Sequence, residues 1–467
     1  MLLRRYYDDR LAQASFLVGC QETGEAIVID PARDISPYLD AVRQEGVRIT
    51  RVTETHIHAD FVSGTRELAE ATGAEMLLSA EGGDDWQYRY PASDTTTALH
   101  DGDVTKVGSV RVAVMHTPGH TPEHLAFVVT DTAQSGDPVA LISGDFLFVG
   151  DVGRPDLLEE AAGVTASKEP SARALFRSLQ RLDSLPDRLL VWPGHGAGSA
   201  CGKSLGAMPS TTLGHERRAN WAFQLHDEPT FVAAVLEGQP ATPPYFGRMK
   251  RVNRDGAVVL GERGAVAGRA PSDLAAALRD GVVVDIRALD AYATAHIPGT
   301  LNIPLTQAFT RWAGWLLPYD RELYLIAPDA PAAGAARQAL ASIGLDRVAG
   351  AFGLDVIATS AAAGTARTTK RSPMTEAARL QHSGRLVVDV RDASEWGAGH
   401  LGGAVHHPLG RLPISLSGVQ RSTPLAVHCE GGTRSAIAAS LLETMGFSDV
   451  IDLIGGWHAW QARPATT

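Results

Sequence analysis

The chain has 467 residues, of which 44% are hydrophobic and 20% are charged, and its formal net charge is −11. At roughly 150 residues per domain, this length predicts about three globular domains. The negative charge argues against nucleic acid as the main ligand, although it does not exclude small anions. No segment reaches the ~18–20 consecutive apolar residues that span a membrane, so we expect no membrane association.

The three cysteines, Cys20, Cys201 and Cys429, are too few and too far apart for a disulfide framework. Reduced thiols are typical of the cytoplasm, and the N-terminus has no apolar stretch typical of a signal peptide, so we expect a cytoplasmic protein. Cys20 ends an apolar predicted strand and reads as a core residue.

Along the chain, the first ~240 residues alternate short apolar strands with helical patterns that end at glycine, which predicts a layered α/β fold. We assign residues 1–245 to the first domain. The rest of the chain repeats itself, because residues 282–305 match residues 386–409 at an offset of 104. This repeat predicts two further α/β domains, over residues 255–360 and 370–467.

A dense cluster of candidate metal ligands occurs in the first domain. The stretch THIHAD places His56, His58 and Asp60 directly after a predicted strand. His120, Asp145 and His195 also follow predicted strands, and each has a glycine beside it that permits a tight turn into a shared cleft. A single histidine is usually structural, but four histidines and two aspartates in this arrangement predict a metal site.

This pattern resembles the metallo-β-lactamase superfamily, whose signature is HxHxDH followed by distant His, Asp and His residues. The resemblance covers roughly residues 1–240 and implies an αββα sandwich. Phe61 stands where the family has a histidine of its second metal centre. Since a phenyl ring cannot bind a metal, we infer a site for a single ion.

Within the superfamily, the persulfide dioxygenases hold one Fe(II) per chain, and the GRPD stretch at residues 153–156 is also similar to theirs. The resemblance implies that His56, His120 and Asp145 bind the iron and leave positions open for a persulfide and O₂. His58, Asp60 and His195 would then orient these ligands and hold water. The alternative is a zinc hydrolase of thioesters, similar to glyoxalase II.

A second reactive site is predicted near the C-terminus. Cys429 follows a predicted strand and begins a glycine-rich loop that leads into a helix. The loop's N–H groups, the start of the helix and the guanidinium of Arg434 would all stabilise a thiolate or a persulfide. The loop residues that we expect to surround the sulfur are Glu430, Gly431, Gly432, Thr433 and Ser435.

This loop, the upstream DVR and GH motifs and the final GGWHAW resemble the rhodanese family over residues 370–463. The family's related phosphatases and arsenate reductases have a longer loop and remain the alternative for this domain. The earlier copy has Ala327 at the cysteine position and no arginine at the end of its loop. We therefore predict an inactive rhodanese-like domain followed by a catalytic one.

The combination resembles fused dioxygenase–sulfurtransferases of sulfide detoxification. It implies that small persulfides and O₂ give sulfite at the iron, and that Cys429 passes sulfur to sulfite to form thiosulfate. Cys201, with Lys203 nearby to favour its thiolate, is a candidate to hold a persulfide, with a packing role as the alternative. A sulfur carrier or sensor without turnover is also open, and the first domain would suit a homodimer or homotetramer.

Overall fold

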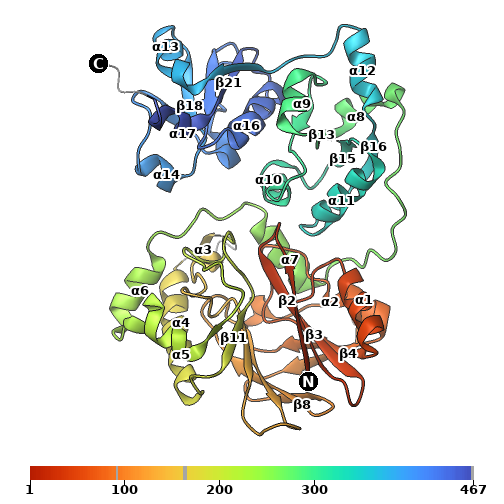
Figure 1. Cartoon of the computed structure of the whole chain (residues 1–467), viewed down its shortest axis with the longest axis vertical. Helices are drawn as coiled ribbons and strands as arrows, with labels where there is room; N and C mark the ends of the chain where they lie inside the picture. The colour runs from red at the N-terminus through yellow and green to blue at the C-terminus, as the bar shows by residue number, and fades with distance from the viewer. Residues whose placement is uncertain (91–92, 161–165, 464–467) are drawn as a thin grey trace. The chain divides into compact units, whose positions relative to one another are not determined.

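The computed structural model describes residues 1–90, 93–160 and 166–463 and divides into two compact units (Figure 1). Unit 1 comprises residues 1–263 and 341–344, and unit 2 comprises residues 264–340 and 345–467. Within the described residues, none of the helices has the length and apolar character that crossing a membrane requires.

Unit 1 contains two six-stranded sheets. The first has the order β1-β2-β3-β4-β5-β6, and it is antiparallel from β1 to β3 and parallel from β3 to β6. Its strands are β1 (Leu2–Asp8), β2 (Gln13–Cys20), β3 (Glu25–Ile29), β4 (Arg48–Thr53), β5 (Glu75–Ser79) and β6 (Thr96–Leu99). The second has the order β12-β11-β10-β9-β8-β7. Its strands are β7 (Val104–Val107), β8 (Val110–His116), β9 (Leu125–Asp131), β10 (Ala140–Gly144), β11 (Leu190–Pro193) and β12 (Thr211–Thr212).

The two sheets pack face to face, because alternate residues of both bury one apolar core, as Phe16 of β2 and Phe127 of β9 do. The outer face of the first sheet is covered by α1 (Ser36–Glu45) and α2 (Thr65–Thr72). The outer face of the second is covered by α4 (Lys168–Gln180), α5 (Leu213–Ala219) and α6 (Glu228–Leu236). The expected αββα sandwich is confirmed. Unit 1 also contains α3 (Leu157–Glu160) and α7 (Phe246–Asp255).

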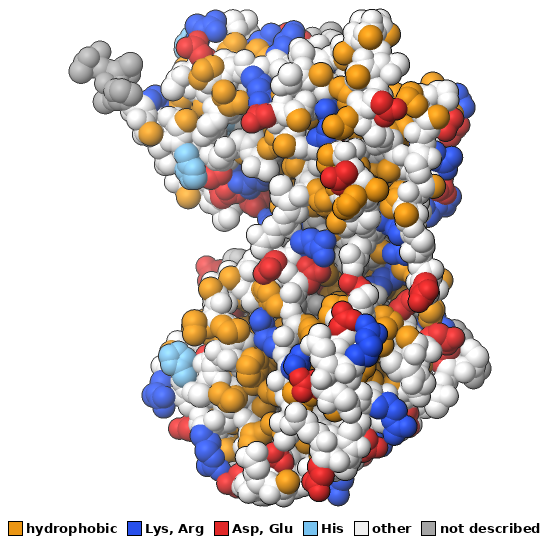
Figure 2. Space-filling view, turned by 45° about the vertical axis from the view of Figure 1, so that its right-hand side comes forward, with side chains coloured by type: hydrophobic (Ala, Val, Ile, Leu, Met, Phe, Trp, Pro, Cys, Tyr) orange, Lys and Arg blue, Asp and Glu red, His pale blue; other side chains and the backbone are white. Residues whose placement is uncertain are grey.

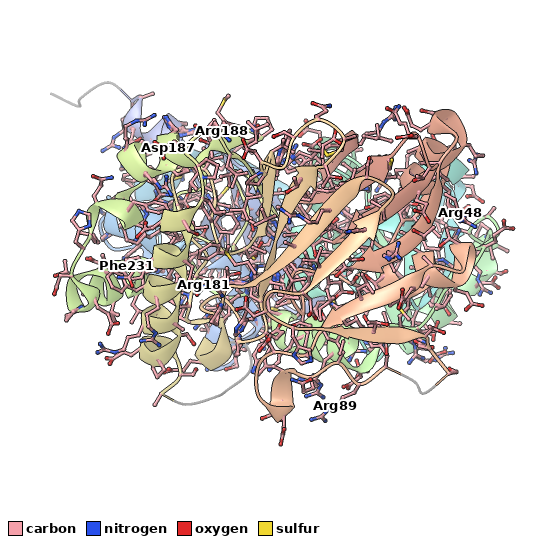
Figure 3. The ribbon with its side chains drawn as sticks, turned by 90° about the horizontal axis from the view of Figure 1, so that it is seen from below. Arg48, Arg89, Arg181, Asp187, Arg188 and Phe231 are labelled. Atoms are coloured by element: carbon pink, nitrogen blue, oxygen red, sulfur yellow. The ribbon has the colours of Figure 1, made fainter. Side chains whose placement is uncertain are left out.

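Aromatic packing holds the outer helices of the second sheet. Phe231 of α6, labelled in Figure 3, is fully buried. Its ring centroid lies 5.3 Å from that of Phe176 on α4 and 5.9 Å from that of Trp221, on which it stacks. These contacts join α4 and α6 on the outer face of the second sheet.

Unit 2 contains two modules with parallel sheets. The first module has the strand order β14-β13-β15-β16, from β13 (Gly281–Asp285), β14 (Leu301–Asn302), β15 (Glu322–Ile326) and β16 (Val348–Phe352). Its helices are α8 (Leu274–Asp280), α9 (Leu289–Thr294), α10 (Phe309–Leu316), α11 (Ala330–Ala341) and α12 (Asp355–Ala362).

The second module has the order β17-β21-β20-β18-β19, from β17 (Lys370–Pro373), β18 (Leu386–Asp389), β19 (Val405–His406), β20 (Leu425–His428) and β21 (Val450–Ile454). Its helices are α13 (Ala377–His382), α14 (Ala393–Gly397), α15 (Leu412–Ser415), α16 (Thr433–Thr444) and α17 (Gly456–Gln461). The two modules share one strand order, apart from the added edge strand β17. In the first module, a single bridge between Gly268 and Ala351 takes the place of β17.

Basic and acidic side chains are intermingled on the face of the molecule in Figure 2, as the mixed charges of the sequence lead one to expect.

Candidate metal centre and sulfur-binding loop

The six polar residues of the predicted metal site all follow strands of unit 1. His56, His58 and Asp60 come after β4, and the remaining three follow β8, β10 and β11; these are His120, Asp145 and His195. All six residues are at least 94% buried. Gly194 is required by this packing, because a Cβ there would lie 2.7 Å from Oδ1 of Asp145. The structure therefore brings together residues up to 139 positions apart.

His56, His120 and Asp145 form one group whose ligand atoms all lie within 4.8 Å of one another. Oδ2 of Asp145 is 3.9 Å from Nε2 of His56 and 3.4 Å from Nε2 of His120. Burial lowers the pKa of both imidazoles, which keeps them neutral and able to bind a metal. These are the three residues that the sequence analysis gives as iron ligands.

The opposite ring nitrogens of these histidines are anchored. Nδ1 of His120 donates to the carbonyl of Arg154 at 3.0 Å, and Nδ1 of His195 donates to the carbonyl of Ala12 at 3.0 Å. Nδ1 of His56 lies 2.9 Å from the hydroxyl of Thr55. Each anchor fixes the ring so that Nε2 faces the cluster, as is usual for metal-binding imidazoles.

His58 points away from this group. Its Nε2 donates to Oδ1 of Asp30 at 2.9 Å, and its ring lies 4.4 Å from that of Phe61. Burial lowers the pKa of His58, but Asp30, Glu54 and Asp60 together outweigh that effect and raise it to about 9. His58 is thus held as the partner of a carboxylate, beside the phenyl ring of Phe61.

Asp60, His195 and Cys201 form a second group, again with ligand atoms within 4.8 Å of one another. Nε2 of His195 lies 3.4 Å from Oδ2 of both Asp60 and Asp145, so the two groups adjoin. Burial, followed by the charges of Asp145 and Asp60, raises the pKa of the Cys201 thiol well above its usual value.

The expected influence of Lys203 on Cys201 is wrong. Nζ of Lys203 donates to the carbonyl of Ala234 at 2.6 Å and lies 4.4 Å from the ring centroid of Trp221. The ammonium group is therefore held by α6 and an indole face instead of facing the thiol. Cys20, as expected, is buried in the core between the sheets.

Two residues that organise the site were missed by sequence reasoning. Asp30 accepts hydrogen bonds from the amide of Thr55 at 2.6 Å, from its hydroxyl and from His58, and it has a φ of 53°. A non-glycine residue in the left-handed region at a strand end is a sign of a functional constraint, but only coordinates reveal it.

Arg154, the second of these residues, is 1% exposed and pairs with both carboxylate oxygens of Asp156 at 2.7 Å. Its backbone and side chain also bind the carbonyls of Cys201 and Ala200. Because its own carbonyl anchors His120, Arg154 links the first ligand group to the segment that carries Cys201.

The donor set fits a metal ion. Both carboxylate oxygens of Asp145 and Nε2 of His195 are buried without a hydrogen-bond partner among the described residues. Leaving buried carboxylate oxygens unsatisfied is costly, and a cation bound between Asp145 and the imidazoles removes that cost. Two imidazoles and a carboxylate suit Fe(II) or Zn²⁺ better than Mg²⁺ or Ca²⁺, which prefer oxygen ligands.

The predicted sulfur-binding loop lies between β20 and α16. Cys429 is 1% exposed, the N–H of Gly432 donates to its Sγ at 3.1 Å, and the hydroxyl of Ser435 lies 3.8 Å from it. Gly432 caps the helix with a φ of 111°, a conformation that favours glycine. The start of α16 thus faces the sulfur, as the sequence predicts.

The GGW motif packs against this loop. A Cβ on Gly456 would lie 2.4 Å from the carbonyl oxygens of both Cys429 and Glu430. The N–H of Trp457 donates to the carbonyl of Cys429 at 2.8 Å. The second glycine of the motif is therefore needed for α17 to approach the loop.

Two arginines hold the loop from the side. Arg434 pairs with both oxygens of Glu395 at 2.6 Å, so its guanidinium is fixed by that carboxylate. Nη1 of Arg391 pairs with Glu430 at 2.8 Å, while its remaining nitrogens bind Asp389 and the carbonyl of Gly399.

Thr433 and Gly431 line a cavity beside the loop. At the corresponding place in the first module lies Ala327, which is buried and offers no nucleophile.

Comparisons with known proteins match the two ends of the chain to two different families. The family model of the metallo-beta-lactamase superfamily matches residues 8–195, and that of the rhodanese-like domain matches residues 374–463. The crystal structure of a metallo-beta-lactamase from Staphylococcus aureus subsp. aureus COL is similar with a TM-score of 0.68 and 41% identity. The similarity covers 76% of this chain and 99% of that one.

Curated relatives match the N-terminal half. A hydroxyacylglutathione hydrolase of Rhodospirillum rubrum is 36% identical over 180 residues, which are 38% of this chain and 60% of the relative. One of Rhodopseudomonas palustris (strain BisB18) is 30% identical over 264 residues, 51% of this chain and 93% of the relative. The chain thus spans less than two thirds of the first of these relatives.

Proposed function

Because this chain belongs to the metallo-β-lactamase superfamily, we propose that unit 1 is a persulfide dioxygenase with one Fe(II) held by His56, His120 and Asp145. The observation that carries the proposal is the bond between His58 and Asp30 at 2.9 Å. It removes a second histidine of the motif from the metal and leaves two imidazoles and one carboxylate. This ligand set is typical of non-haem iron oxygenases.

The proposed reaction converts an organic persulfide, O₂ and water into a thiol, sulfite and two protons. The outer sulfur is oxidised, O₂ is reduced, and the thiol leaves with the inner sulfur. Iron, when bound, supplies the redox chemistry that brings O₂ into reaction with sulfur. The chain's own contribution is to orient His56 and His120 through Thr55 and Arg154 and to bury the site from bulk water.

Cys201 is the residue that we propose for holding a persulfide beside this centre, because it adjoins the first ligand group through His195 and Asp60. The alternative is packing alone. A Cys201→Ser variant that keeps full oxygen uptake and an unchanged product ratio would exclude a role in sulfur handling. A matched Cys20→Ser variant controls for general thiol effects.

The test of the dioxygenase is metal analysis after anaerobic purification, followed by oxygen uptake with a small persulfide. The proposal predicts about one iron per chain and uptake of one O₂ per sulfite formed. A His120→Ala variant should lose both the iron and the uptake. Iron that is retained without uptake would point to a sulfur carrier or sensor.

The second candidate is a zinc-dependent thioester hydrolase. It is favoured by the group of Asp60, His195 and Cys201, which offers donors for a second ion, and by the curated relatives named above. In that case the protein would contain zinc, cleave thioesters and consume no oxygen. Those results would overturn the dioxygenase and leave the proposal for unit 2 intact.

For unit 2, we propose a sulfurtransferase whose nucleophile is Cys429 in the second module, next to a first module of rhodanese type without a nucleophile. The N–H of Gly432 and the start of α16 support a thiolate or a persulfide on Cys429. Sulfite would attack the outer sulfur of the Cys429 persulfide and leave as thiosulfate, and the thiolate of Cys429 would be regenerated.

Because both activities lie on one chain, sulfite formed in unit 1 reaches Cys429 at a raised effective concentration. The Cys429→Ser variant supplied with persulfide and O₂ should then release sulfite in place of thiosulfate. An unaltered yield of thiosulfate would contradict this series.

A further inference from the structure

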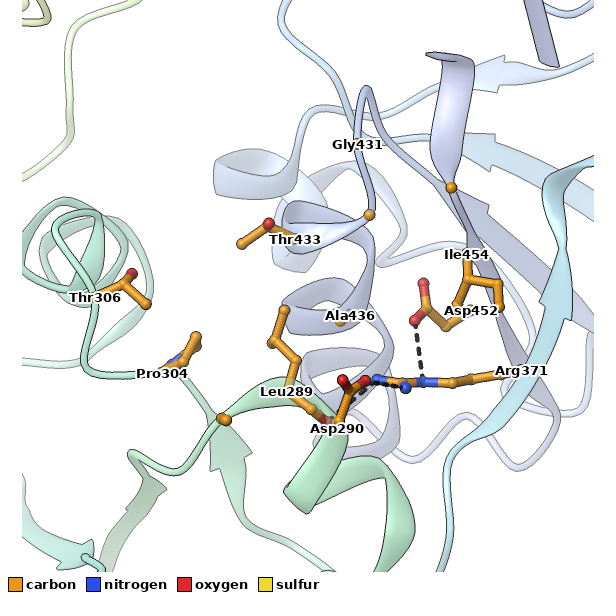
Figure 4. Close-up of a pocket in the computed structure, with 13 residues that line it drawn as sticks. Leu289, Asp290, Pro304, Thr306, Arg371, Gly431, Thr433, Ala436, Asp452 and Ile454 are labelled. Carbon is orange, nitrogen blue, oxygen red and sulfur yellow. Dashed lines mark hydrogen bonds and ion pairs between the residues drawn. The ribbon is translucent and has the colours of Figure 1, made fainter. Parts of the chain in front are cut away.

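A cavity of about 420 Å³ lies in unit 2, between the two modules (Figure 4). The second module contributes Gly431, Gly432 and Thr433 of the sulfur-binding loop, together with residues of α16 and β21. The first module contributes the start of α9 and the segment that follows β14. A volume of this size accommodates a small organic molecule.

One wall of the cavity carries a buried carboxylate without a full set of partners. Asp452 of β21 is 1% exposed, and its Oδ1 has no hydrogen-bond partner among the described residues. Its Oδ2 lies 3.6 Å from Nε of Arg371, the ion pair that is drawn in Figure 4. Burial raises the pKa of Asp452 to about 6, although a hydrogen bond with Ser435 and the charge of Arg371 lower it, so the carboxyl is largely ionised at neutral pH.

The same arginine also serves a second carboxylate. Nη1 of Arg371 pairs with Asp290 of α9 at 2.6 Å, and Nη2 donates to the carbonyl of Leu289. One guanidinium therefore pairs with two carboxylates, of which Asp452 is buried and Asp290 is exposed to solvent. A ligand that brings a cationic hydrogen-bond donor would satisfy Oδ1 of Asp452.

The cavity is also bounded by the loop that holds the reactive sulfur. Gly432, which lines it, donates its N–H to Sγ of Cys429 at 3.1 Å. A sulfane sulfur on Cys429 would extend the side chain by an S–S bond of about 2 Å. The donor that loads Cys429 must itself carry a persulfide, so the ligand class is a small thiol compound with its outer sulfur at the loop.

We propose that this cavity binds the organic persulfide that loads Cys429, and that Asp452 selects thiol carriers with a free primary ammonium group. The inference rests on the proposed sulfurtransferase and names its donor class. In the loading step, the Cys429 thiolate attacks the outer sulfur of R–S–S⁻. A new S–S bond forms on Cys429, the old one breaks, and the electron pair leaves with the carrier as R–S⁻.

Sulfite has no cationic donor and gains nothing from Asp452. The carboxylate should therefore affect the loading of Cys429 and leave its unloading by sulfite unchanged. This separation of the two half-reactions distinguishes a selective site from a general change in the reactivity of Cys429.

The test uses the full chain and two persulfides that differ at the amine: cysteine persulfide, which has the ammonium group, and N-acetylcysteine persulfide, which lacks it. The rate at which the Cys429 peptide gains 32 mass units is measured by quenched mass spectrometry. We expect the wild-type chain to load about tenfold faster from cysteine persulfide, the size of one charge-assisted hydrogen bond. Asp452→Asn should abolish this preference, and the exposed Asp320→Asn should keep it.

Equal loading by the two persulfides in the wild-type chain, or a preference that survives in Asp452→Asn, would overturn the inference. The loading rates of the wild-type chain with the two persulfides test the preference for an ammonium group even if the variant fails to fold. If neither persulfide loads Cys429, the sulfurtransferase itself is wrong. Loading at equal rates, followed by normal formation of thiosulfate, refutes only the selection by Asp452.

Discussion

The two modules of unit 2 share a scaffold but differ in the segment that follows one strand. In both, an aspartate at the end of a central strand pairs with an arginine two residues later, as Asp285 and Arg287 do in the first. In the second, Asp389 and Arg391 repeat that pair. Each arginine also donates to a backbone carbonyl eight residues later, which is that of Ala295 in the first module and that of Gly399 in the second. The shared pair belongs to the fold, whereas Cys429 and its loop carry the chemistry.

The partners outside the shared pair show how the modules diverged. Arg391 also pairs with Glu430 of the sulfur-binding loop. Among the described residues, Arg287 has no corresponding carboxylate partner in its own module. His296 of the first module is fully buried and bonds Glu443 of α16 at 2.9 Å. Its sequence counterpart His400 is exposed and stacks on Trp396. The first module thus uses a motif histidine to pack against the second.

The largest effect expected from this comparison concerns the nucleophile. Cys429→Ser should reduce sulfur transfer from thiosulfate to cyanide to the background rate, because a hydroxyl cannot take up sulfane sulfur. The reciprocal Ala327→Cys should gain no activity, since no glycine-rich loop surrounds that position. Mass spectrometry of the two peptides checks which cysteine carries sulfur, and a persulfide on residue 327 would contradict the assignment of the chemistry to the loop of the second module.

The shared ion pair should stabilise both modules. Asp285→Asn leaves the largely buried Arg287 without its charge partner, and Asp389→Asn leaves the buried Arg391 with Glu430 alone, each at a cost of up to about 3 kcal/mol in the free energy of unfolding. Chemical denaturation measures both. Sulfur transfer in folded protein should fall further for Asp389→Asn, because Arg391 also holds Glu430. Equal losses of activity would mean that the pair acts through stability alone.

A smaller difference is expected for the two histidines. His296→Ala removes a buried hydrogen bond to Glu443 and a stacked contact with Tyr292 at 4.2 Å, which should cost about 2 kcal/mol. His400→Ala removes an exposed ring and should cost about 0.5 kcal/mol or less. Thermal and chemical unfolding of the pair provide the check, and an equal or reversed order would contradict the assigned contact between modules.

Much of the scaffold could be predicted because it follows from local patterns. Strands that end in polar residues, a glycine-rich loop before a helix and a repeated segment of 24 residues can all be recognised in the sequence. These patterns placed the ligands at sheet ends and Cys429 at the start of α16. Such patterns predict which residues lie at the ends of the strands, and therefore which side chains can lie close together.

What the sequence could not predict is the choice that a side chain makes between partners. His58 stands two residues from His56, yet it bonds Asp30, which lies 28 positions earlier. Lys203 lies two residues from Cys201 and turns to Ala234 and Trp221 instead. Such choices depend on which partner is buried and correctly spaced in three dimensions, and proximity in sequence does not determine that.

An effect smaller than that of His296→Ala is expected at Asp452. Asp452 of β21 lies opposite Val427 of β20. In the first module, Leu325 of β15 corresponds to Val427, and the residue opposite it is Ala351 of β16. Ala351 is therefore the counterpart of Asp452. Burial raises the pKa of Asp452 to about 6, above the ~3.9 of an unfolded aspartate, so the folded state binds the proton more tightly. The carboxyl therefore destabilises the fold above pH 6, and this loss is recovered as the pH falls towards 4.

Asp452→Asn should consequently raise the free energy of unfolding by about 1 kcal/mol at pH 7.5, after allowance for the burial of the amide. The advantage over the wild-type chain should shrink to nothing near pH 4, where both side chains are neutral. Denaturation at the two pH values measures it, with Asp320→Asn as the exposed control. A variant that is less stable at pH 7.5 would show that the pair with Arg371 outweighs the cost of burial. A more stable variant would mean that the second module keeps a costly carboxylate where the first has alanine, which is expected of a group retained for binding and not for folding.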